Sequence, residues 1–427
     1  MAFESEEIRK RQHRRRQDAH RRKEQQKLLR RRLKIGLICA AAIIVLCAIL
    51  IIFLRNDAST SGPDSTVSTT APVQTHPTAP ETVINIAIGG DLNVTDQVIA
   101  AGAFGDSYDY TAVFKDIVPL FASADASIIN FEGNLCGKPY GTQYTSAPPE
   151  LMTALASAGV DMIQMANSCS INNGLLGLQE TLSGIRNAGM EPLGAYGSDE
   201  EFENSRGFTL RSINGVKVAF VAFTKGMDGL SLPEGSENYV NLLYTDYTST
   251  YQDVNEAGIK NILRNIALEK PDVTVALLHW GSEYNNQVSD SQKQIIKLMQ
   301  DEGVDAIVGT HSHYVQKLEF DKEKGTVVAY SLGDLLGNGE KTNTDSSIIL
   351  QLEVTKNNTT GESKISAVTY TPVYIATAEK DEMERIQLIR IPEAITAYEA
   401  NSIHKVSSET YTAMKNAFSR IRSRTGL

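Results

Sequence analysis

Six short stretches of the sequence contain residues that bind metal ions, and each follows a run of apolar residues typical of a strand. They are Gly89–Asn93, Asn130–Gly133, Ala166–Cys169, His279–Glu283, Gly309–His313 and Ser331–Asp334. Six of their side chains form a mixed set of oxygen and nitrogen ligands suited to Mn, Fe or Zn: Asp91, Glu132, Asn167, His279, His311 and His313. Such sets often hold two metal ions that activate water and bind a phosphate-like or carbonyl-like group. We therefore expect two divalent metal ions and a metal-activated water as nucleophile.

Most of these stretches also have an ordinary structural explanation. Gly90-Asp91 is a common turn sequence, Glu132 could cap a strand end, and His279 could be a buried core histidine. The strongest individual signal is His311-Ser312-His313, because alternation along an extended chain points both imidazoles to the same side. The other histidines lie in the tail, the linker or the terminal helix: His13, His20, His76 and His404.

The elements that must position these residues alternate between strands and helices from Thr82 onward. Short β-branched runs predict strands at 83–88, 126–130, 161–165, 216–223, 273–279 and 306–308. Amphipathic stretches predict helices at 150–158, 177–188, 255–269 and 289–302. Open α/β sheets bind ligands at the carboxyl ends of their strands, which is where the metal-binding residues fall.

The second half of the chain is richer in strands. Strands are predicted at 315–320, 326–331, 347–354 and 364–375, and a helix at 393–421. We expect a two-sheet α/β sandwich over residues 82–380, followed by a helical segment at 381–427. Residues 226–247 predict a long surface loop, whose Tyr, Asn and Ser content could alternatively line a groove.

The N-terminal region predicts a membrane anchor. Residues 1–34 form a basic tail, Ile35–Leu54 is an uncharged apolar stretch of twenty residues, and 55–81 is a Ser/Thr/Pro-rich linker. Twenty helical residues span roughly 30 Å, the thickness of a bilayer core. The positive-inside rule keeps the tail in the cytoplasm and exports everything after the anchor. A cleaved signal peptide is the alternative, but no small-x-small cleavage site follows.

The net charge of the chain changes sign after the basic tail. Residues 1–34 contain 14 Lys/Arg and 5 Asp/Glu, whereas the rest contains 27 and 46. An acidic main domain makes nucleic acid an unsuitable partner. The tail could bind nucleic acid by itself, but beside a membrane helix it is explained by topology and anionic lipid.

The motifs resemble, in order, those of the bacterial capsule-synthesis CapA-type family associated with poly-γ-glutamate capsules. The resemblance covers about residues 84–373, through Gly90-Asp91, Asn130-x-Glu132-Gly133, Ala166-Asn167, His279-Trp280-Gly281-x-Glu283, His311-x-His313 and Ser331-Leu332-Gly333. It implies a fold similar to calcineurin-like metallophosphoesterases. It also implies that the six residues named above are the metal ligands, with Glu132 bridging.

Two positions depart from the phosphoesterase pattern. Asn93 stands where a ligand histidine is usual, and Cys169 stands where a histidine usually protonates the leaving group. Cys136 and Cys169 are the only cysteines of the exported part and follow Glu132 and Asn167 closely. We predict a disulfide between them, since exported pairs usually oxidise; two free thiols or thiolate ligands are the alternatives.

Two functions follow from this resemblance. The first is a metal-dependent hydrolase or transferase acting on a cell-surface polymer or its precursor, together with other membrane proteins of capsule synthesis. The second is a non-catalytic subunit whose degenerate site binds polymer or organises an export complex. A receptor-like domain that reuses the fold is a third class.

Overall fold

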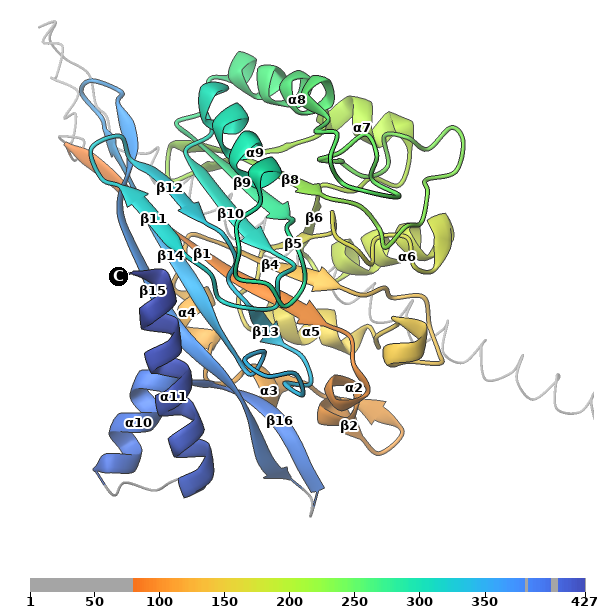
Figure 1. The fold of residues 1–427 in the computed structure, drawn as a ribbon, viewed down its shortest axis with the longest axis vertical. Coiled ribbons are helices and arrows are strands. Elements are labelled where there is room, and N and C mark those ends of the chain that lie inside the picture. The colour runs from red at the N-terminus through yellow and green to blue at the C-terminus, as the bar shows by residue number, and fades with distance from the viewer. Residues whose placement is uncertain (1–79, 381–382, 401–405, 427) are drawn as a thin grey trace, which may run out of the picture. The chain divides into compact units, whose positions relative to one another are not determined.

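The computed structural model describes residues 80–380, 383–400 and 406–426 (Figure 1). The basic tail, the expected membrane helix at 35–54 and most of the linker lie outside these residues. Within the described ranges, no helix combines the length and apolar composition needed to cross a bilayer.

The larger sheet has eight strands and mixes parallel with antiparallel pairing. Its strands are β1 (Glu81–Asn93), β4 (Ala126–Glu132), β5 (Met162–Gln164), β6 (Glu191–Leu193), β13 (Asp334–Leu336), β14 (Ser346–Asn357), β15 (Ser363–Lys380) and β16 (Met383–Arg390). Their order is β16-β15-β14-β1-β4-β5-β6, and β13 also pairs with β1. β1, β4, β5, β6 and β13 are linked by parallel pairing, so their carboxyl ends meet at one edge.

The second sheet has six strands. They are β7 (Thr209–Ile213), β8 (Val216–Thr224), β9 (Val273–His279), β10 (Ala306–Thr310), β11 (Leu318–Asp321) and β12 (Thr326–Ala329). The order is β11-β12-β10-β9-β8-β7, with β8, β9, β10 and β12 parallel. A short hairpin, β2 (Ala103–Phe104) and β3 (Ser107–Tyr108), stands apart from both sheets.

The two sheets share one apolar core. Every second residue of β8 from Val216 to Ala222 belongs to the same buried cluster as the apolar residues of β1. The alternate residues from Ala219 to Phe223 belong to a second cluster with α8 (Glu256–Glu269) and α9 (Asp290–Asp301). Figure 1 shows these two helices over β8, β9 and β10. Because side chains alternate along a strand, the smaller sheet is buried on both faces, and the structure confirms the expected α/β class.

Aspartates at the amino ends of four parallel strands align them with their neighbours. Asp125, Asp161, Asp272 and Asp305 precede β4, β5, β9 and β10. Each exchanges two hydrogen bonds with one residue of the adjacent strand: its backbone N–H donates to that residue's carbonyl, and its carboxylate accepts that residue's N–H. These bonds fix the register of the strands, and the register determines where their carboxyl ends lie.

The remaining helices connect or cover the sheets. They are α2 (Asp96–Gly102), α3 (Thr111–Phe114), α4 (Val118–Ala122), α5 (Glu150–Ser157), α6 (Gly174–Asn187) and α7 (Asp199–Ser205), with a 3₁₀ turn η1 (Thr142–Tyr144). As the sequence predicted, residues 226–247 form a loop; it extends over 225–255 between β8 and α8.

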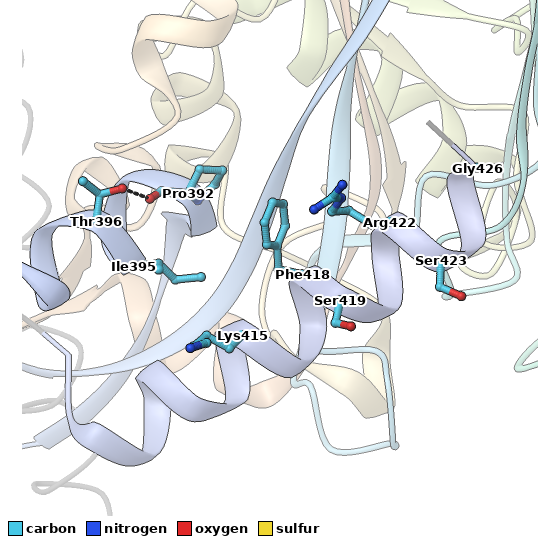
Figure 2. A pocket seen from close by; sticks show the side chains of 9 residues that line it. All are labelled: Pro392, Ile395, Thr396, Lys415, Phe418, Ser419, Arg422, Ser423 and Gly426. Atoms are coloured by element: carbon cyan, nitrogen blue, oxygen red, sulfur yellow. Dashed lines mark hydrogen bonds between the residues drawn. The ribbon is translucent and has the colours of Figure 1, made fainter.

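The C-terminal region differs from its prediction as one helical segment. Met383–Arg390 forms strand β16, which pairs in antiparallel fashion with β15 at an edge of the larger sheet. Two helices follow, α10 (Ile391–Glu399) and α11 (Ser408–Thr425), and both contact β15. A pocket of about 810 Å³ between them is lined by Ile395, Phe418 and Arg422 among others (Figure 2). None of the predicted metal ligands lines it.

Candidate metal centre

Asp91 lies where three strands of the larger sheet meet. In the parallel pairings of β1, Asp91 is opposite Asn130 of β4 and Asp334 of β13. The Asp91 N–H donates to the carbonyl of Gly333 at 3.0 Å. This close approach of two backbones requires glycine at position 90, because a Cβ there would overlap the Gly333 carbonyl oxygen. Asp91 is fully buried.

The smaller sheet brings its histidines to the same place. His279 ends β9 and is opposite Thr310, the last residue of β10. The N–H of His311 then donates to Asp91 Oδ2 at 2.9 Å, which joins the ends of the two sheets. Asn130 Nδ2 donates to the other Asp91 oxygen at 2.6 Å.

The stretch His311-Ser312-His313 is a turn, so the prediction of an extended chain is wrong. Both histidines have positive φ, 88° at His311 and 60° at His313. For residues other than glycine this conformation is strained and is found where surrounding contacts enforce it, commonly at functional sites. As a result the two rings have different partners: His311 contacts His279, whereas His313 contacts Asp334.

Two groups of side chains among the described residues could each hold a metal ion. One consists of Asp91, Glu132 and His279, and the other of Asp91, His313 and Asp334; the ligand atoms of each group lie within 4.8 Å of one another. All five residues are buried. Asp91 belongs to both groups, which makes it the central residue of the site.

In the first group, burial disfavours the charged form of each ionisable side chain. Burial raises the pKa of Asp91, and it raises the pKa of Glu132 well above its ordinary value, with the nearby Asp91 charge raising it further. Burial lowers the pKa of His279 well below its ordinary value, with a further contribution from His311, and lowers the pKa of His311 to about 3. Neutral imidazoles are the form that binds metal ions.

The second group contains a buried ion pair. His313 Nδ1 lies 2.7 Å from Asp334 Oδ1, and Nε2 lies 3.7 Å from Glu283 Oε1. Burial lowers the pKa of His313, but the hydrogen bonds with Asp334 and Glu283 outweigh it and raise the pKa to about 12. Tyr284 stacks on the His313 ring with centroids 4.9 Å apart, and Lys341 Nζ lies 3.6 Å from the Tyr284 centroid.

The donor set fits a divalent cation. Three buried carboxylates, Asp91, Glu132 and Asp334, lie together, and buried negative charge is costly unless it is paired or coordinated. His313 is the cation paired with one of them. A divalent ion would compensate the remainder.

The asparagine and glutamate of the predicted set differ in their surroundings. Asn167 donates its amide to Asn130 Oδ1 at 3.0 Å and to the Phe131 carbonyl at 2.7 Å, and its oxygen accepts the N–H of Cys169 at 3.0 Å. It therefore braces β4 in this structure. Glu132 Oε2 accepts from Ser168 at 3.1 Å and lies 4.0 Å from His279 Nε2.

The predicted disulfide between Cys136 and Cys169 is wrong, because both cysteines are free. After β4 the chain runs along α6, where the neighbouring Leu135 N–H donates to Thr181 and the Cys136 side chain lies against Gly177. The Cys169 thiol instead lies near Glu132, and burial raises its pKa well above the ordinary value.

Three residues of the centre were not among the predicted ligands. Asp334 followed a recognised Ser-Leu-Gly stretch but was not assigned a role, although its position after β12 resembled that of Asp91 after an apolar run. Asn130 belonged to a recognised motif but only Glu132 was chosen from it. Lys225 follows β8 and carries no motif; burial lowers its pKa, against the effect of Asp228 and Glu283.

A pocket of about 290 Å³ opens onto the centre. Its lining includes Glu132, Cys169, His313 and Asp334 from the centre. Its outer part is formed by residues of the following loops: Asp228, Glu283, Tyr284, Asn338 and Lys341 among them. A substrate could thus approach the carboxylates from solvent.

Two solved structures with similar folds have low superposition scores. One is the calcineurin-like phosphoesterase YfkN from Bacillus subtilis, 16% identical with a TM-score of 0.41, over 80% of this chain and all of that one. The other is a putative 5'-nucleotidase from Staphylococcus aureus, 11% identical with a TM-score of 0.40, over 79% of this chain and 58% of that one.

Sequence relatives are more informative. The PGA biosynthesis protein CapA of Bacillus subtilis (strain 168) is 26% identical over 287 residues, which are 65% of this chain and 70% of the relative. The capsule biosynthesis protein CapA of Bacillus anthracis is 26% identical over 259 residues, 59% of this chain and 60% of the relative. Residues 85–339, more than half of the chain, match the family described as "Bacterial capsule synthesis protein PGA_cap". The chain therefore belongs to the bacterial capsule synthesis protein family.

Proposed function

We propose that this protein acts in the biosynthesis or export of a capsule or cell-surface polymer of the poly-γ-glutamate type, as a metal-dependent hydrolase or transferase. The observation that carries the proposal is the convergence of three buried carboxylates and three histidines at the carboxyl ends of strands from two sheets. A divalent ion held by Asp91 with either group would polarise a water molecule and a substrate oxygen.

Other residues of the site hold the metal-binding side chains in position and attract the substrate. Asn130 and the His311 N–H hold the two Asp91 oxygens in place. Asp334 holds the His313 ring in place through Nδ1, beside the carboxylates. Lys341 at the pocket wall offers a positive charge to an anionic polymer.

The proposed location is the outer face of the membrane. The uncharged stretch Ile35–Leu54 after a basic tail supports a single-pass anchor with the main domain exported. Partners would then be the polymer or its precursor, the membrane, and other membrane proteins of capsule synthesis.

A second candidate function is binding of the polymer without cleavage. It is favoured by Cys169, which lines the pocket at the position expected to donate a proton. Burial raises its pKa well above the ordinary value, which makes the thiol a poor proton donor.

Activity and binding assays on the purified full-length chain, loaded with Mn²⁺, distinguish the two candidate functions. We expect it to shorten poly-γ-glutamate or to hydrolyse bis-p-nitrophenyl phosphate, and we expect Asp91→Asn to lose this activity. Metal-dependent binding of the polymer without turnover would support the second function. If the chain neither binds nor cleaves either compound, both candidates fail.

A further inference from the structure

The pocket between α10 and α11 lies apart from the metal centre and has a mixed lining. Its volume of about 810 Å³ is within the range typical of ligand-binding pockets. Figure 2 shows Ile395 of α10 and Phe418 of α11 between the two helices. Other lining residues supply hydroxyl groups and two cations: Thr396, Ser419, Ser423, Lys415 and Arg422. Apolar surface is thus combined with hydrogen-bonding and positively charged groups.

One side of α11 faces this pocket, whereas another is buried. Met414 and Ala417 belong to the buried side, and the helix contacts β15. Lys415, Phe418 and Arg422 are spaced three and four residues apart, so they form a separate stripe along the helix. Phe418 is half-buried, but Lys415 and Arg422 are exposed. Both charges are therefore accessible to a ligand in the pocket.

The arginines of α11 differ in their partners. Arg420 Nη2 donates to Asp345 Oδ1 at 2.6 Å, and Arg424 Nη1 donates to a backbone carbonyl at 3.3 Å. These two contacts attach the helix to the rest of the domain. Arg422 makes no hydrogen bond or ion pair with any residue that the structure describes, and its guanidinium carbon lies 5.8 Å from the centroid of the Phe418 ring.

The charge of the pocket differs from that of the surrounding domain. Lys415 Nζ lies 3.9 Å from Glu399 Oε1, but both side chains are more than half exposed, so water screens the pair. None of the described residues that line the pocket is acidic. In contrast, the chain after residue 34 contains 27 Lys/Arg and 46 Asp/Glu. Charge complementarity therefore favours an anionic ligand.

We propose that this pocket binds a segment of an anionic polymer of the γ-glutamyl type. In a γ-linked chain each unit keeps a free carboxylate and two methylene groups. The carboxylates would pair with Lys415 and Arg422, whose guanidinium matches the geometry of a carboxylate, and the methylene groups would lie on Ile395 and Phe418. This inference rests on the polymer class named in the proposed function, and it adds a binding site that needs no metal ion.

The lining favours such a polymer over an anionic lipid. Among the described lining residues, only Pro392, Ile395 and Phe418 have large apolar side chains. An acyl chain would cover the hydroxyl groups of Thr396 and Ser419 without offering them a hydrogen bond, which is costly. The amide and carboxylate groups of a polymer can bond to them.

Fluorescence anisotropy of labelled poly-γ-glutamate measures binding to the full-length chain in EDTA at about 0.1 M salt. We expect the wild type to bind, and the double substitution Lys415→Gln with Arg422→Gln to bind at least tenfold more weakly. The matched control, Lys293→Gln with Lys297→Gln, removes two exposed charges from α9 and should bind like the wild type. Equal weakening by the two pairs would show a general effect of charge and overturn the inference.

Alkylation by iodoacetamide locates the polymer without removing a charge. Ser419→Cys places a thiol in the pocket, and we expect added polymer to slow its alkylation at least fivefold, measured by mass spectrometry of the α11 peptide. Gln300→Cys, at an exposed position of α9, is the control and should be unaffected. Protection by a short-chain phosphatidylglycerol but not by the polymer would identify a lipid site and overturn the inference.

The dependence on metal separates this site from the proposed function. Polymer binding that requires Mn²⁺ and is unchanged in the Lys415 and Arg422 double variant would overturn the pocket as a polymer site while leaving the metal centre standing. A wild type that does not bind the polymer with or without Mn²⁺ would overturn both the pocket and the polymer class of the proposed function.

Discussion

At the scale of single residues, the types of the metal-binding side chains could be read from the sequence but their contacts could not. Asp91 and the three histidines follow apolar runs, and strand ends at one edge of a sheet must converge. The turn at His311 and His313 was not predictable, because its positive φ angles are enforced by tertiary contacts such as the bond from His311 to Asp91. The same contacts decide that Asn167 braces β4.

The ion pair between His313 and Asp334 predicts an effect on stability. His313→Gln leaves the Asp334 carboxylate buried without a cation, and breaking such a pair costs about 3–5 kcal/mol of unfolding free energy. Chemical denaturation of the metal-free chain measures this cost. Lys293→Gln, which removes an exposed pair with Asp290, should have a far smaller effect, because water screens exposed ion pairs. Equal effects of the two substitutions would contradict the buried-pair account.

At the scale of elements, the strands were predictable where β-branched runs are long, and less so where they are short. β13 has three residues and is a strand only because Gly333 approaches β1. β16 was missed because its apolar and polar residues do not alternate strictly and lie next to a helical pattern, so pairing with β15 decides its conformation.

The approach of β13 to β1 can be tested at Gly90. Gly90→Ala forces a methyl group against the Gly333 carbonyl and should separate Asp91 from Asp334. We expect a loss of about 1–3 kcal/mol in unfolding free energy and weaker Mn²⁺ binding, measured by denaturation and dialysis. Gly197→Ala is the control, because its methyl group would closely approach only the flexible end of the Glu201 side chain and would make ordinary van der Waals contact with Gln179 and Leu182. A stable Gly90→Ala chain with unchanged Mn²⁺ affinity would show that this approach is unimportant.

The strand-start aspartates predict a pH dependence at Asp305. Burial raises its pKa to about 6 from 3.8, although the N–H of Thr274 opposes the shift. The folded state thus binds the proton more tightly, so the stabilising contribution is complete below about pH 4 and is lost as the pH rises through about 6. Asp305→Asn keeps an oxygen for Thr274 but does not titrate.

The unfolding free energy of Asp305→Asn, relative to the wild type, should therefore rise by about 1–2 kcal/mol between pH 4 and pH 7, after allowance for partial solvent screening. Urea denaturation at both pH values provides the measurement. A difference that is constant with pH would mean that Asp305 titrates normally in the folded chain.

At the scale of the whole molecule, the sequence predicted the α/β class and the two sheets, because these depend on hydrophobic patterns, and it predicted helix at the C-terminus but not the strand β16 before it. It did not predict that Cys136 and Cys169 stay apart, because their separation depends on the path of the loop along α6.

The membrane anchor at 35–54 remains a prediction. We expect the full-length chain to sediment with membranes and to be released by detergent but not by 1 M salt, to which peripheral proteins respond. Release by salt alone would contradict the anchor.

The central claim is that the strand ends form a divalent metal centre around Asp91. Asp91 belongs to both candidate groups, so its substitution should abolish metal binding wherever the ion lies. The most direct measurement is the metal content of the purified full-length chain and of Asp91→Asn after equilibration with Mn²⁺ and removal of free ion. The account predicts a stoichiometric ion in the wild type and none in the folded variant. A wild type without metal, or a variant that retains it, would contradict the account.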